Sequence, residues 1–548
     1  MSKLDVLVVG AGPTGMTAAI ELARRNVSVR IVERRTTPST SSKALVMHAR
    51  TLELMDILGV ADEMVHRGYT SPGIEFSANL EKPLRANAHK LDTQFSYILI
   101  LPQAETEEIL ERYLNKLGIK IERGCTLTGF SETENAVRCT IERAEGGTFE
   151  INASYIVGAD GVHSMVRKTL DLPFEGYRYG WTAFLGDVRL HGHHAEGGTE
   201  QHFSNRGLGF IVPFKDGSHR IVTIDHDYQG DLETRELKLE ELQNSISSIL
   251  EKPVELTDPK WLTRWGSSLR IVPQYRVGRA FIGGDAAHTH SPAGGQGMNT
   301  GIQDAFNLGW KLAFVIKGEA PEALLNTYNS ERYPLGKRAL RVSNLLIRSL
   351  RLRQNLLRKL RQALLSIVIP LPPVQRKITI TLSGLGVRYK TGDGKLAGVR
   401  MPDMELMNAE HEKVRLYKLL SFPGYTLLLF IGPDQAQSAR EQIEQILCNA
   451  DDMLKSHVIL NSGLPKLHNF KASTLVDYRG DFENKIGSKT GRIILVRPDA
   501  YVAFDLAALD PDAFKKQLRK WKTERSIPPE TPILQEMPLQ GSRSLTCS

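Results

Sequence analysis

Residues 6–15 read Val-Leu-Val-Val-Gly-Ala-Gly-Pro-Thr-Gly, an apolar run that enters a Gly-x-Gly-x-x-Gly turn. The aliphatic run predicts a central parallel strand, and the pattern from Met16 to Asn26 predicts a helix. A second predicted strand, over 27–32, ends at Glu33. This is the βαβ fingerprint of a dinucleotide site: the glycines admit a pyrophosphate at the helix N-terminus, and the acidic residue accepts hydrogen bonds from a ribose.

Two later motifs favour FAD, which the fingerprint alone does not distinguish from NAD. Residues 156–167 contain Asp160-Gly161, and residues 280–300 run from an apolar strand through Gly284-Asp285 into a glycine-rich helix start. An aspartate there can accept from ribityl hydroxyls, and the helix N-terminus can stabilise an anionic reduced flavin. The three ordered motifs resemble those of the class A flavoprotein aromatic hydroxylases, single-component FAD monooxygenases built like p-hydroxybenzoate hydroxylase.

The resemblance implies an α/β fold with a discontinuous FAD-binding Rossmann-type (GR2-like) domain and an inserted antiparallel-sheet substrate domain. The alternating strands within 176–270 are typical of a sheet with one buried face. The C-terminal part resembles the thioredoxin-like domain of phenol hydroxylases, polyketide hydroxylases and rifampicin monooxygenase. The expected bounds are 1–75, 100–175 and 266–340 for the FAD domain, 76–99 and 176–265 for the substrate domain, 341–395 for linking helices, 396–525 for the thioredoxin-like domain and 526–548 for a tail.

The resemblance also implies which residues hold FAD, without a covalent bond. They are Gly10, Gly12, Pro13, Thr14, Gly15, Glu33, Arg34, Lys43, Gln103, Leu127, Asp160, Gly284, Asp285, Pro292, Gly295, Gly297, Met298 and Asn299. Lys43 stands where the family usually has an arginine, so the positive charge is kept but the bidentate fork is lost.

The activity implied is an NAD(P)H- and FAD-dependent monooxygenase that uses O₂ to hydroxylate a phenolic or polyketide/quinone-like aromatic substrate through a flavin C4a-hydroperoxide. Expected substrate contacts are Trp181, His202, Phe210 and Pro213. The catalytic side chain is unknown, with His48 and Pro292 as candidates. The same motifs would serve Baeyer–Villiger oxygenation, epoxidation or N-hydroxylation, and a non-catalytic flavin-binding protein is a further alternative.

The charge distribution argues against a nucleic-acid partner. The net charge is +8, yet residues 337–377 alone hold 11 basic and no acidic residues, so the rest of the chain is slightly acidic. This segment lacks the interleaved aromatic residues of a base-stacking surface. It could lie on a membrane as a basic amphipathic helix, but packing and linking helices are the favoured interpretation.

Cysteine usage and the chain start predict the compartment. The four cysteines include no CxxC pair, which argues against a disulfide scaffold and a zinc site. No apolar run reaches the ~18 residues of a membrane span, and residues 1–10 lack a signal-peptide pattern. The sequence therefore predicts a cytoplasmic protein without bound metal, either a monomer or a homodimer.

Overall fold

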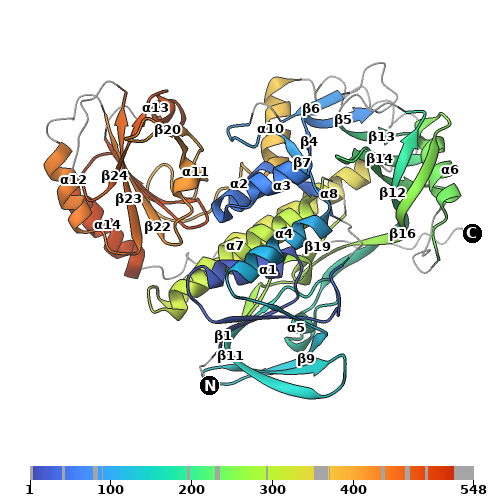
Figure 1. The fold of residues 1–548 in the computed structure, drawn as a ribbon, viewed down its shortest axis with the longest axis horizontal. Helices are drawn as coiled ribbons and strands as arrows, with labels where there is room; N and C mark the ends of the chain where they lie inside the picture. Colours follow the sequence, from blue (N-terminus) through green and yellow to red (C-terminus); the bar gives the residue numbers. More distant parts are fainter. Residues whose placement is uncertain are drawn as a thin grey trace, which may run out of the picture.

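The computed structural model contains four β-sheets within the residues that it describes (Figure 1). The described residues are 4–39, 44–77, 84–88, 91–193, 198–228, 235–291, 294–350, 368, 371–432, 439–462, 470–487 and 491–523. Several predictions fall outside them, namely those for Lys43, Pro292, the tail 526–548 and part of the basic segment.

The first sheet carries the dinucleotide fingerprint. Its order is β17-β18-β11-β1-β2-β8, with β10 and β9 attached beside β11. The strands are β1 (Leu4–Val9), β2 (Val29–Glu33), β8 (Ile121–Arg123), β9 (Cys125–Glu132), β10 (Val137–Arg143), β11 (Thr148–Gly158), β17 (Arg276–Val277) and β18 (Ala280–Ile282). β1 is parallel to both β2 and β11, and β18 is parallel to β11. The carboxyl ends of β1, β11 and β18 therefore meet at one edge, where a doubly wound sheet binds its ligand.

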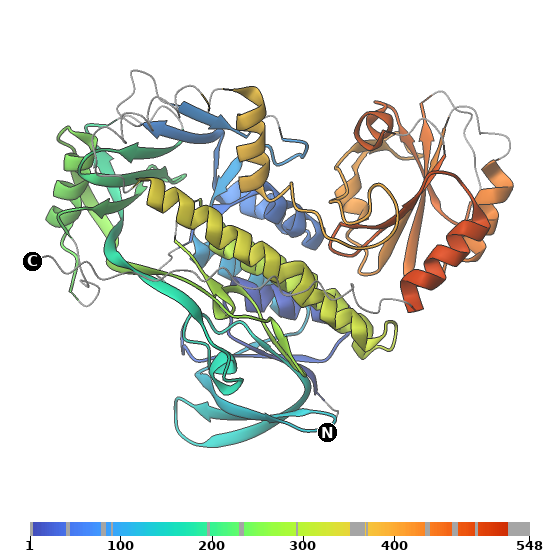
Figure 2. The same cartoon turned by 180° about the vertical axis from the view of Figure 1, so that it is seen from behind.

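Helix α1 (Pro13–Ala23) packs on this sheet, and α4 (Gln103–Lys116) and α7 (Gln296–Ile316) pack against α1. The long α8 (Asn326–Leu350) crosses the back of the molecule (Figure 2). Smaller elements complete this part of the chain. They are α2 (Ala49–Leu58), α3 (Ala61–Arg67), α5 (Met165–Thr169), the 3-10 helices η1 (Gly284–Ala286) and η2 (Glu322–Leu325), α10 (Pro372–Ser383), and a small sheet of β3 (Val46–Met47), β7 (Ile98–Ile100) and β4 (Tyr69–Ser71).

The second sheet has the order β19-β16-β12-β15-β14-β13-β5-β6. Its strands are β5 (Gly73–Ser77), β6 (Leu84–Asn87), β12 (Glu175–His191), β13 (Thr199–Phe203), β14 (Gly207–Pro213), β15 (His219–Asp225), β16 (Glu255–Ile271) and β19 (His288–Thr289). Helix α6 (Leu239–Leu250) packs on one face, over Ile211 and Ile221, which are buried with its Leu242 and Ile246. The other face turns toward the first sheet and α7.

The third sheet stands apart, in orange and red in Figure 1. Its order is β21-β20-β24-β23-β22-β25-β26, with β22, β23 and β24 parallel. The elements are β20 (Glu405–Met407), β21 (Lys413–Arg415), α11 (Leu416–Leu419), β22 (Tyr425–Ile431), α12 (Ala439–Cys448), β23 (Leu454–Asn461), β24 (Ser473–Asp477), α13 (Asp481–Ile486), β25 (Arg492–Val496), β26 (Val502–Leu506) and α14 (Pro511–Thr523). The α/β fold class is confirmed, while the thioredoxin-like assignment and the domain bounds stay predictions.

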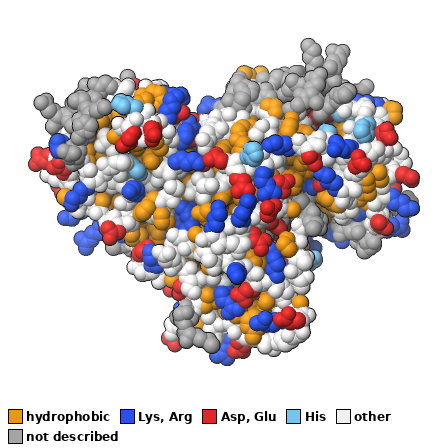
Figure 3. All heavy atoms as spheres, viewed as in Figure 1, with side chains coloured by type: hydrophobic (Ala, Val, Ile, Leu, Met, Phe, Trp, Pro, Cys, Tyr) orange, Lys and Arg blue, Asp and Glu red, His pale blue; other side chains and the backbone are white. Residues whose placement is uncertain are grey.

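The surface adds one observation on charge. On the face seen in Figure 3, basic and acidic side chains are intermixed. Among the described residues, no helix is both long enough and apolar enough to cross a bilayer.

Candidate active site

A large cavity lies where the first sheet, the start of α7 and the second sheet meet. Its volume is about 790 Å³, within the range of cofactor and ligand sites. The fingerprint turn supplies Gly12, Pro13 and Thr14 to its wall, and the start of α7 supplies Gly294 to Met298. One cavity thus collects motifs that are almost 300 residues apart in the chain.

The fingerprint glycines are required for two different reasons. Gly10 has φ +100°, and a Cβ there would lie 2.3 Å from the Ala159 carbonyl oxygen. A Cβ on Gly15 would lie 1.9 Å from the Gly10 carbonyl oxygen, so both positions exclude a side chain because backbones touch. Gly12 differs: a Cβ there would meet nothing within 4 Å. Its α-carbon opens onto the cavity, where a ligand can approach the backbone.

Two helix N-termini face this cavity. The N-cap of α1 is Gly12 and that of α7 is Gly295, and neither helix has a side-chain cap. Uncapped N–H groups and the positive end of a helix attract anions. The first turns contribute Thr14 on one side and Met298 on the other. The cavity is therefore built to receive a ligand with negative charge at two separate places.

Asn299 and His48 hold the glycine-rich loop before α7 from behind. The Asn299 amide donates to the carbonyls of Val46 (2.8 Å) and Gly295 (2.7 Å), and its oxygen accepts from the backbone N–H of His48. His48 Nε2 donates to the Gly294 carbonyl (2.8 Å). Burial lowers the pKa of His48. Neither side chain lines the cavity, so His48 positions the loop and does not face the substrate.

Glu33 closes the fingerprint turn. Its carboxylate accepts from the backbone N–H of Ala11 (2.9 Å) and from the backbone N–H of Arg35 (3.0 Å). Burial opposes ionisation of Glu33, but these hydrogen bonds and the Arg35 charge outweigh it and lower the pKa. The carboxylate is thus ionised and fixed at the end of β2, where it can still accept from a ribose hydroxyl.

Asp160 lies at the end of β11 and caps the following helix. Its Oδ2 accepts from the backbone N–H of Met165 (2.6 Å), whereas its Oδ1 is buried without a hydrogen-bond partner. Arg167 nearby lines the cavity and donates to the carbonyls of Ala286 (2.9 Å) and Val162 (2.7 Å). Asp160 thus fixes the turn after β11, and its neighbours Ala159 and Gly161 line the cavity while Asp160 itself does not.

Asp285 is exposed in the cavity wall, and a buried ion-pair cluster beneath it fixes its turn. In this cluster Asp304 accepts from the Gly284 backbone N–H (3.2 Å), His288 Nε2 (2.8 Å) and Arg332 Nε (2.7 Å). Burial would raise the pKa of Asp304, but Arg332 and His288 lower it. The cluster ties η1 to α7 and α8.

The second sheet forms the opposite wall. Its apolar side chains are Ile74, Leu185, Phe210, Val212, Val222 and Trp265. Polar residues of the same sheet line the cavity beside them, namely Arg178, Thr199, Gln201, Arg220, Ser267, Ser268, Arg270 and Thr289. Arg220 makes a bidentate pair with Asp187 (2.6 and 2.8 Å) and lies over the Trp261 ring. This wall suits a ligand that is apolar over part of its surface and carries polar groups elsewhere.

The predicted site residues divide into three groups. Gly12, Pro13, Thr14, Gln103, Asp285, Gly295, Gly297, Met298 and Phe210 line the cavity. Gly10, Gly15, Glu33, Asp160, Gly284 and Asn299 support its wall without lining it. Arg34, Leu127, Trp181, His202 and Pro213 lie outside its lining. Trp181 stacks on Tyr179 in the core, and Leu127 is buried in β9.

His290 is a cavity residue that the sequence analysis did not single out, although it lies inside the quoted motif. Its ring stacks parallel to that of His288. Nδ1 contacts the Ser291 carbonyl at 3.0 Å, whereas Nε2 is buried without a partner. Burial lowers the pKa of His290. A neutral ring with Nδ1–H as donor therefore leaves Nε2 as an acceptor that is buried beside Gly297 without a partner among the described residues.

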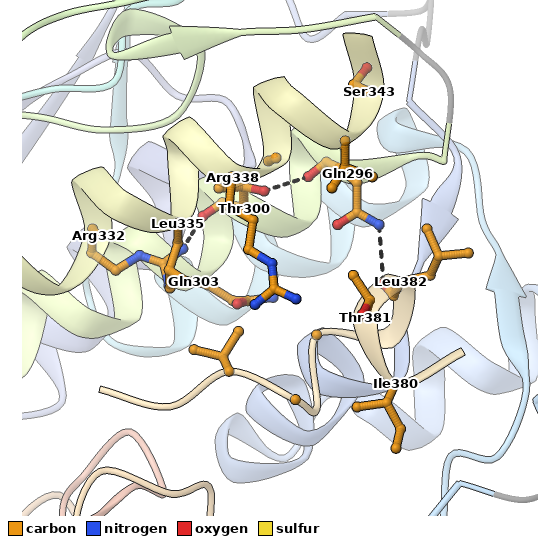
Figure 4. Close-up of a pocket in the computed structure, with 15 residues that line it drawn as sticks. Gln296, Thr300, Gln303, Arg332, Leu335, Arg338, Ser343, Ile380, Thr381 and Leu382 are labelled. Atoms are coloured by element: carbon orange, nitrogen blue, oxygen red, sulfur yellow. Dashed lines mark hydrogen bonds between the residues drawn. The ribbon is translucent and has the colours of Figure 1, made fainter. Parts of the chain in front are cut away.

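A second cavity, of about 80 Å³, lies behind the first turn of α7 (Figure 4). Gln296 lines both cavities. Its amide donates to the Leu382 carbonyl (3.1 Å), and its backbone carbonyl accepts from the Thr300 hydroxyl (2.9 Å). The side chain of Gln296 thus separates the two spaces and ties α7 to the end of α10.

These features fit FAD. The open face of Gly12 and the N-terminus of α1 suit the pyrophosphate of FAD. Glu33 suits the ribose, and the exposed Asp285 suits the ribityl chain. The uncapped start of α7 suits the electron-rich edge of the flavin ring. Together these residues form what we call the FAD cradle. It fits a dinucleotide whose flavin ring extends toward the second sheet.

Comparison with known proteins gives the class. A family model described as an FAD binding domain matches residues 3–343. The chain belongs to this family, and with it to the FAD-dependent aromatic hydroxylases, which confirms the resemblance inferred from the motifs. It is a monooxygenase whose cofactor is FAD, with NAD(P)H as the family's usual co-substrate.

Individual relatives cover almost the whole chain. The chain is 33% identical to YhjG of Bacillus subtilis, described as an uncharacterized aromatic compound monooxygenase, over 95% of this chain and 98% of that protein. It is 34% identical to 6-methylpretetramide 4-monooxygenase of Streptomyces rimosus, over 91% and 90%. The solved structure of OxyS anhydrotetracycline hydroxylase from Streptomyces rimosus superposes with a TM-score of 0.75 at 29% identity, covering 94% of this chain and 99% of that one.

Proposed function

We propose that this monooxygenase hydroxylates a large, flat aromatic substrate of the phenolic or polyketide/quinone-like type. The proposal depends on one observation. The FAD cradle and the apolar side chains of the second sheet face each other across the same cavity. Relatives named as monooxygenases of 6-methylpretetramide, anhydrotetracycline and pentachlorophenol agree with substrates of this class.

The FAD cradle has one task in this account, which is to bind and orient the cofactor. Bound FAD supplies the electron transfer and the oxygen chemistry. The N-terminus of α1 neutralises the charge of the pyrophosphate. Glu33 binds the ribose of FAD, and Asp285 binds its ribityl chain. The N-terminus of α7 lies where the helix dipole favours negative charge on the flavin ring. His48 and Asn299 keep that helix end in place from behind.

The second sheet has the task of excluding water. Its apolar side chains cover the substrate side of the cavity, and Arg220 is neutralised by Asp187. A dry cavity limits side reactions and strengthens the remaining polar contacts. This suits an apolar ring system better than a small charged substrate.

His290 is the side chain that we assign to substrate orientation. Its ring lines the cavity, and its Nε2 has no partner among the described residues. In this proposal the ring turns toward the bound substrate, so that Nε2 accepts a hydrogen bond from a phenolic hydroxyl and directs the activated ring carbon. Replacement by glutamine removes the imidazole acceptor. We expect His290→Gln to keep FAD but to lower the yield of hydroxylated product per NADPH, with more hydrogen peroxide. Unchanged coupling would reject this role.

The direct test is a screen of phenols and polycyclic quinones for substrate-stimulated NADPH and NADH oxidation, with mass spectrometry of the products. We expect a product heavier by one oxygen atom, with the oxygen on a ring carbon. Ring expansion, an epoxide or an N-oxide would support the alternative oxygenations. FAD binding without NAD(P)H consumption for any substrate would support a non-catalytic flavin protein.

A further inference from the structure

A cluster of two histidines and a glutamate lies on the face of the second sheet that turns away from the cavity. His193 follows β12, and Glu200 and His202 belong to β13. Nε2 of His193 lies 2.8 Å from Glu200 Oε2, and Nε2 of His202 lies 2.6 Å from the same oxygen. All three ligand-type atoms lie within 4.8 Å of one another.

The register of β13 explains why this cluster is separate from the FAD site. Successive side chains of a strand point to opposite faces. Thr199 and Gln201 line the cavity, so Glu200 and His202 point to the other face. There Glu200 pairs across the sheet with Ile211, which packs under α6. His202, which the sequence analysis places against the substrate, therefore faces away from it.

The cluster is partly enclosed. The exposed fractions of the side chains are 10% for His193, 7% for Glu200 and 15% for His202. His219 on β15, the strand beside β12, adds a third imidazole nearby. Two imidazoles and a carboxylate are thus held together with little exposure to solvent.

Hydrogen bonding within the cluster is incomplete. The Nδ1 atoms of His193 and His219 are both buried without a partner. A cation site here would depend on the other atoms of the cluster. Oε2 of Glu200 and the Nε2 atoms of His193 and His202 converge within 4.8 Å of one another, and such a set of imidazole nitrogen and carboxylate oxygen can hold a cation.

We propose that His193, Glu200 and His202 bind a divalent transition-metal ion, with Zn²⁺ as the best-suited member of the class. Imidazole nitrogen and carboxylate oxygen are both Zn²⁺ ligands, at about 2.0–2.2 Å from the metal. Ligand atoms around a tetrahedral ion are then roughly 3.3 Å apart. The two short contacts open by less than ~1 Å to reach this spacing. Water fills the remaining coordination position.

The ion would join the end of β12 to β13. His193 follows β12 and Glu200 lies in β13, so the metal would link these two strands. It would also fix the strand whose alternate side chains, Thr199 and Gln201, line the cavity. The site is structural in this account and does not depend on which substrate the enzyme hydroxylates.

The test is Zn²⁺ titration of the FAD-loaded full-length protein after chelator treatment, in competition with a chromophoric chelator. We expect one tight equivalent, bound at least ~100-fold more weakly in His193→Ala and His202→Ala, because even loss of an outer-shell partner costs 10–100-fold. Co²⁺ should give visible absorption bands in the wild type but not in these two variants. His191→Ala is the matched control, since His191 is exposed and its ring hydrogen-bonds Thr257, outside the cluster; it should bind Zn²⁺ like the wild type.

FAD content and far-UV circular dichroism establish that each variant is folded. If an alanine variant loses FAD, the milder His202→Gln and Glu200→Gln decide the question, and retained tight binding in both overturns the proposal. It is also overturned if the wild type takes up no Zn²⁺, or if His191→Ala and His202→Ala lose binding equally.

Discussion

The cavity and the contact of the C-terminal part of the chain with helices α2 and α8 both concentrate charged and polar groups, but they use them in opposite ways. At the contact, Arg497 pairs with Glu331 (2.8 and 2.8 Å) and with Asp499 (2.9 and 2.6 Å). Arg400 reaches from the third part of the chain to Glu53 on α2 (2.7 Å). The cavity wall instead keeps the carboxylate of Asp285 exposed. The paired charges hold two parts of the chain together, whereas the cavity leaves a carboxylate open to a ligand.

The largest expected effect breaks the contact. Arg497→Met leaves Glu331 and Asp499 buried without their main partner, which costs about 3–5 kcal/mol of unfolding free energy. The control is Arg479→Met in the same domain, where an exposed pair with Glu405 contributes ~1 kcal/mol or less. Urea unfolding followed by fluorescence measures both. Similar shifts for the two variants would show that the buried network does not hold the domains together.

The second prediction concerns a substitution that blocks the FAD site but leaves the fold intact. Gly12→Val places a side chain in the open space at the N-terminus of α1. We therefore expect FAD affinity to fall roughly 100-fold or more, which is about 3 kcal/mol of binding free energy. Gly129→Val is the control, because a Cβ there also meets nothing within 4 Å but lies in β9. Flavin absorbance after gel filtration gives the FAD content. A Gly12→Val protein that stays fully yellow would contradict the cradle.

A smaller effect separates two neighbouring glycines of the α7 loop. Gly295 has φ +60°, and a Cβ there would lie 2.6 Å from Val46 Cβ, whereas a Cβ on Gly297 would meet only His290, at 3.7 Å. Gly295→Ala should therefore cost roughly 1–2 kcal/mol of stability and weaken FAD binding, while Gly297→Ala stays close to the wild type. The thermal unfolding midpoints of the two FAD-loaded variants distinguish these outcomes. Equal midpoints would show that the loop tolerates strain at Gly295.

The smallest effect is a pH dependence located at the contact. Burial lowers the pKa of Lys311 from 10.5 to about 7, although Glu331 opposes the shift. Between those pH values the unfolded chain holds a proton that the folded chain has released, so stability rises with pH, by up to ~1.4 kcal/mol per unit. Lys311→Met lacks this contribution. Unfolding free energies at several pH values from about 7 to 9 should rise more steeply in the wild type; parallel curves would contradict the assignment.

The parts of the molecule that depend on local pattern could be predicted from the sequence. The strand over 6–9, the glycine turn, Glu33 and the Gly284-Asp285 turn all lie where their motifs place them, because turn geometry and strand period are encoded within a few residues. The parallel pairing of β1, β11 and β18 follows from the same βαβ logic. The FAD-dependent class thus follows from these motifs alone.

Side-chain direction could not be predicted in the same way. The sequence pattern suggests His202 as a substrate contact, but strand register turns it to the other face, and one residue of register decides this. His48 lies behind the α7 loop because Asn299, 251 residues away, binds its backbone. The Asp304–His288–Arg332 cluster likewise joins separate elements. No spacing rule within one segment reveals such contacts.

The central claim is that the cavity transfers one atom of O₂ to an aromatic ring at the expense of NAD(P)H. The most direct measurement is turnover of a substrate found by the screen under ¹⁸O₂, with mass spectrometry of the product. The account predicts one ¹⁸O atom on a ring carbon of the product and consumption of NAD(P)H in step with it. A product whose new oxygen is unlabelled, and therefore comes from water, would contradict the account.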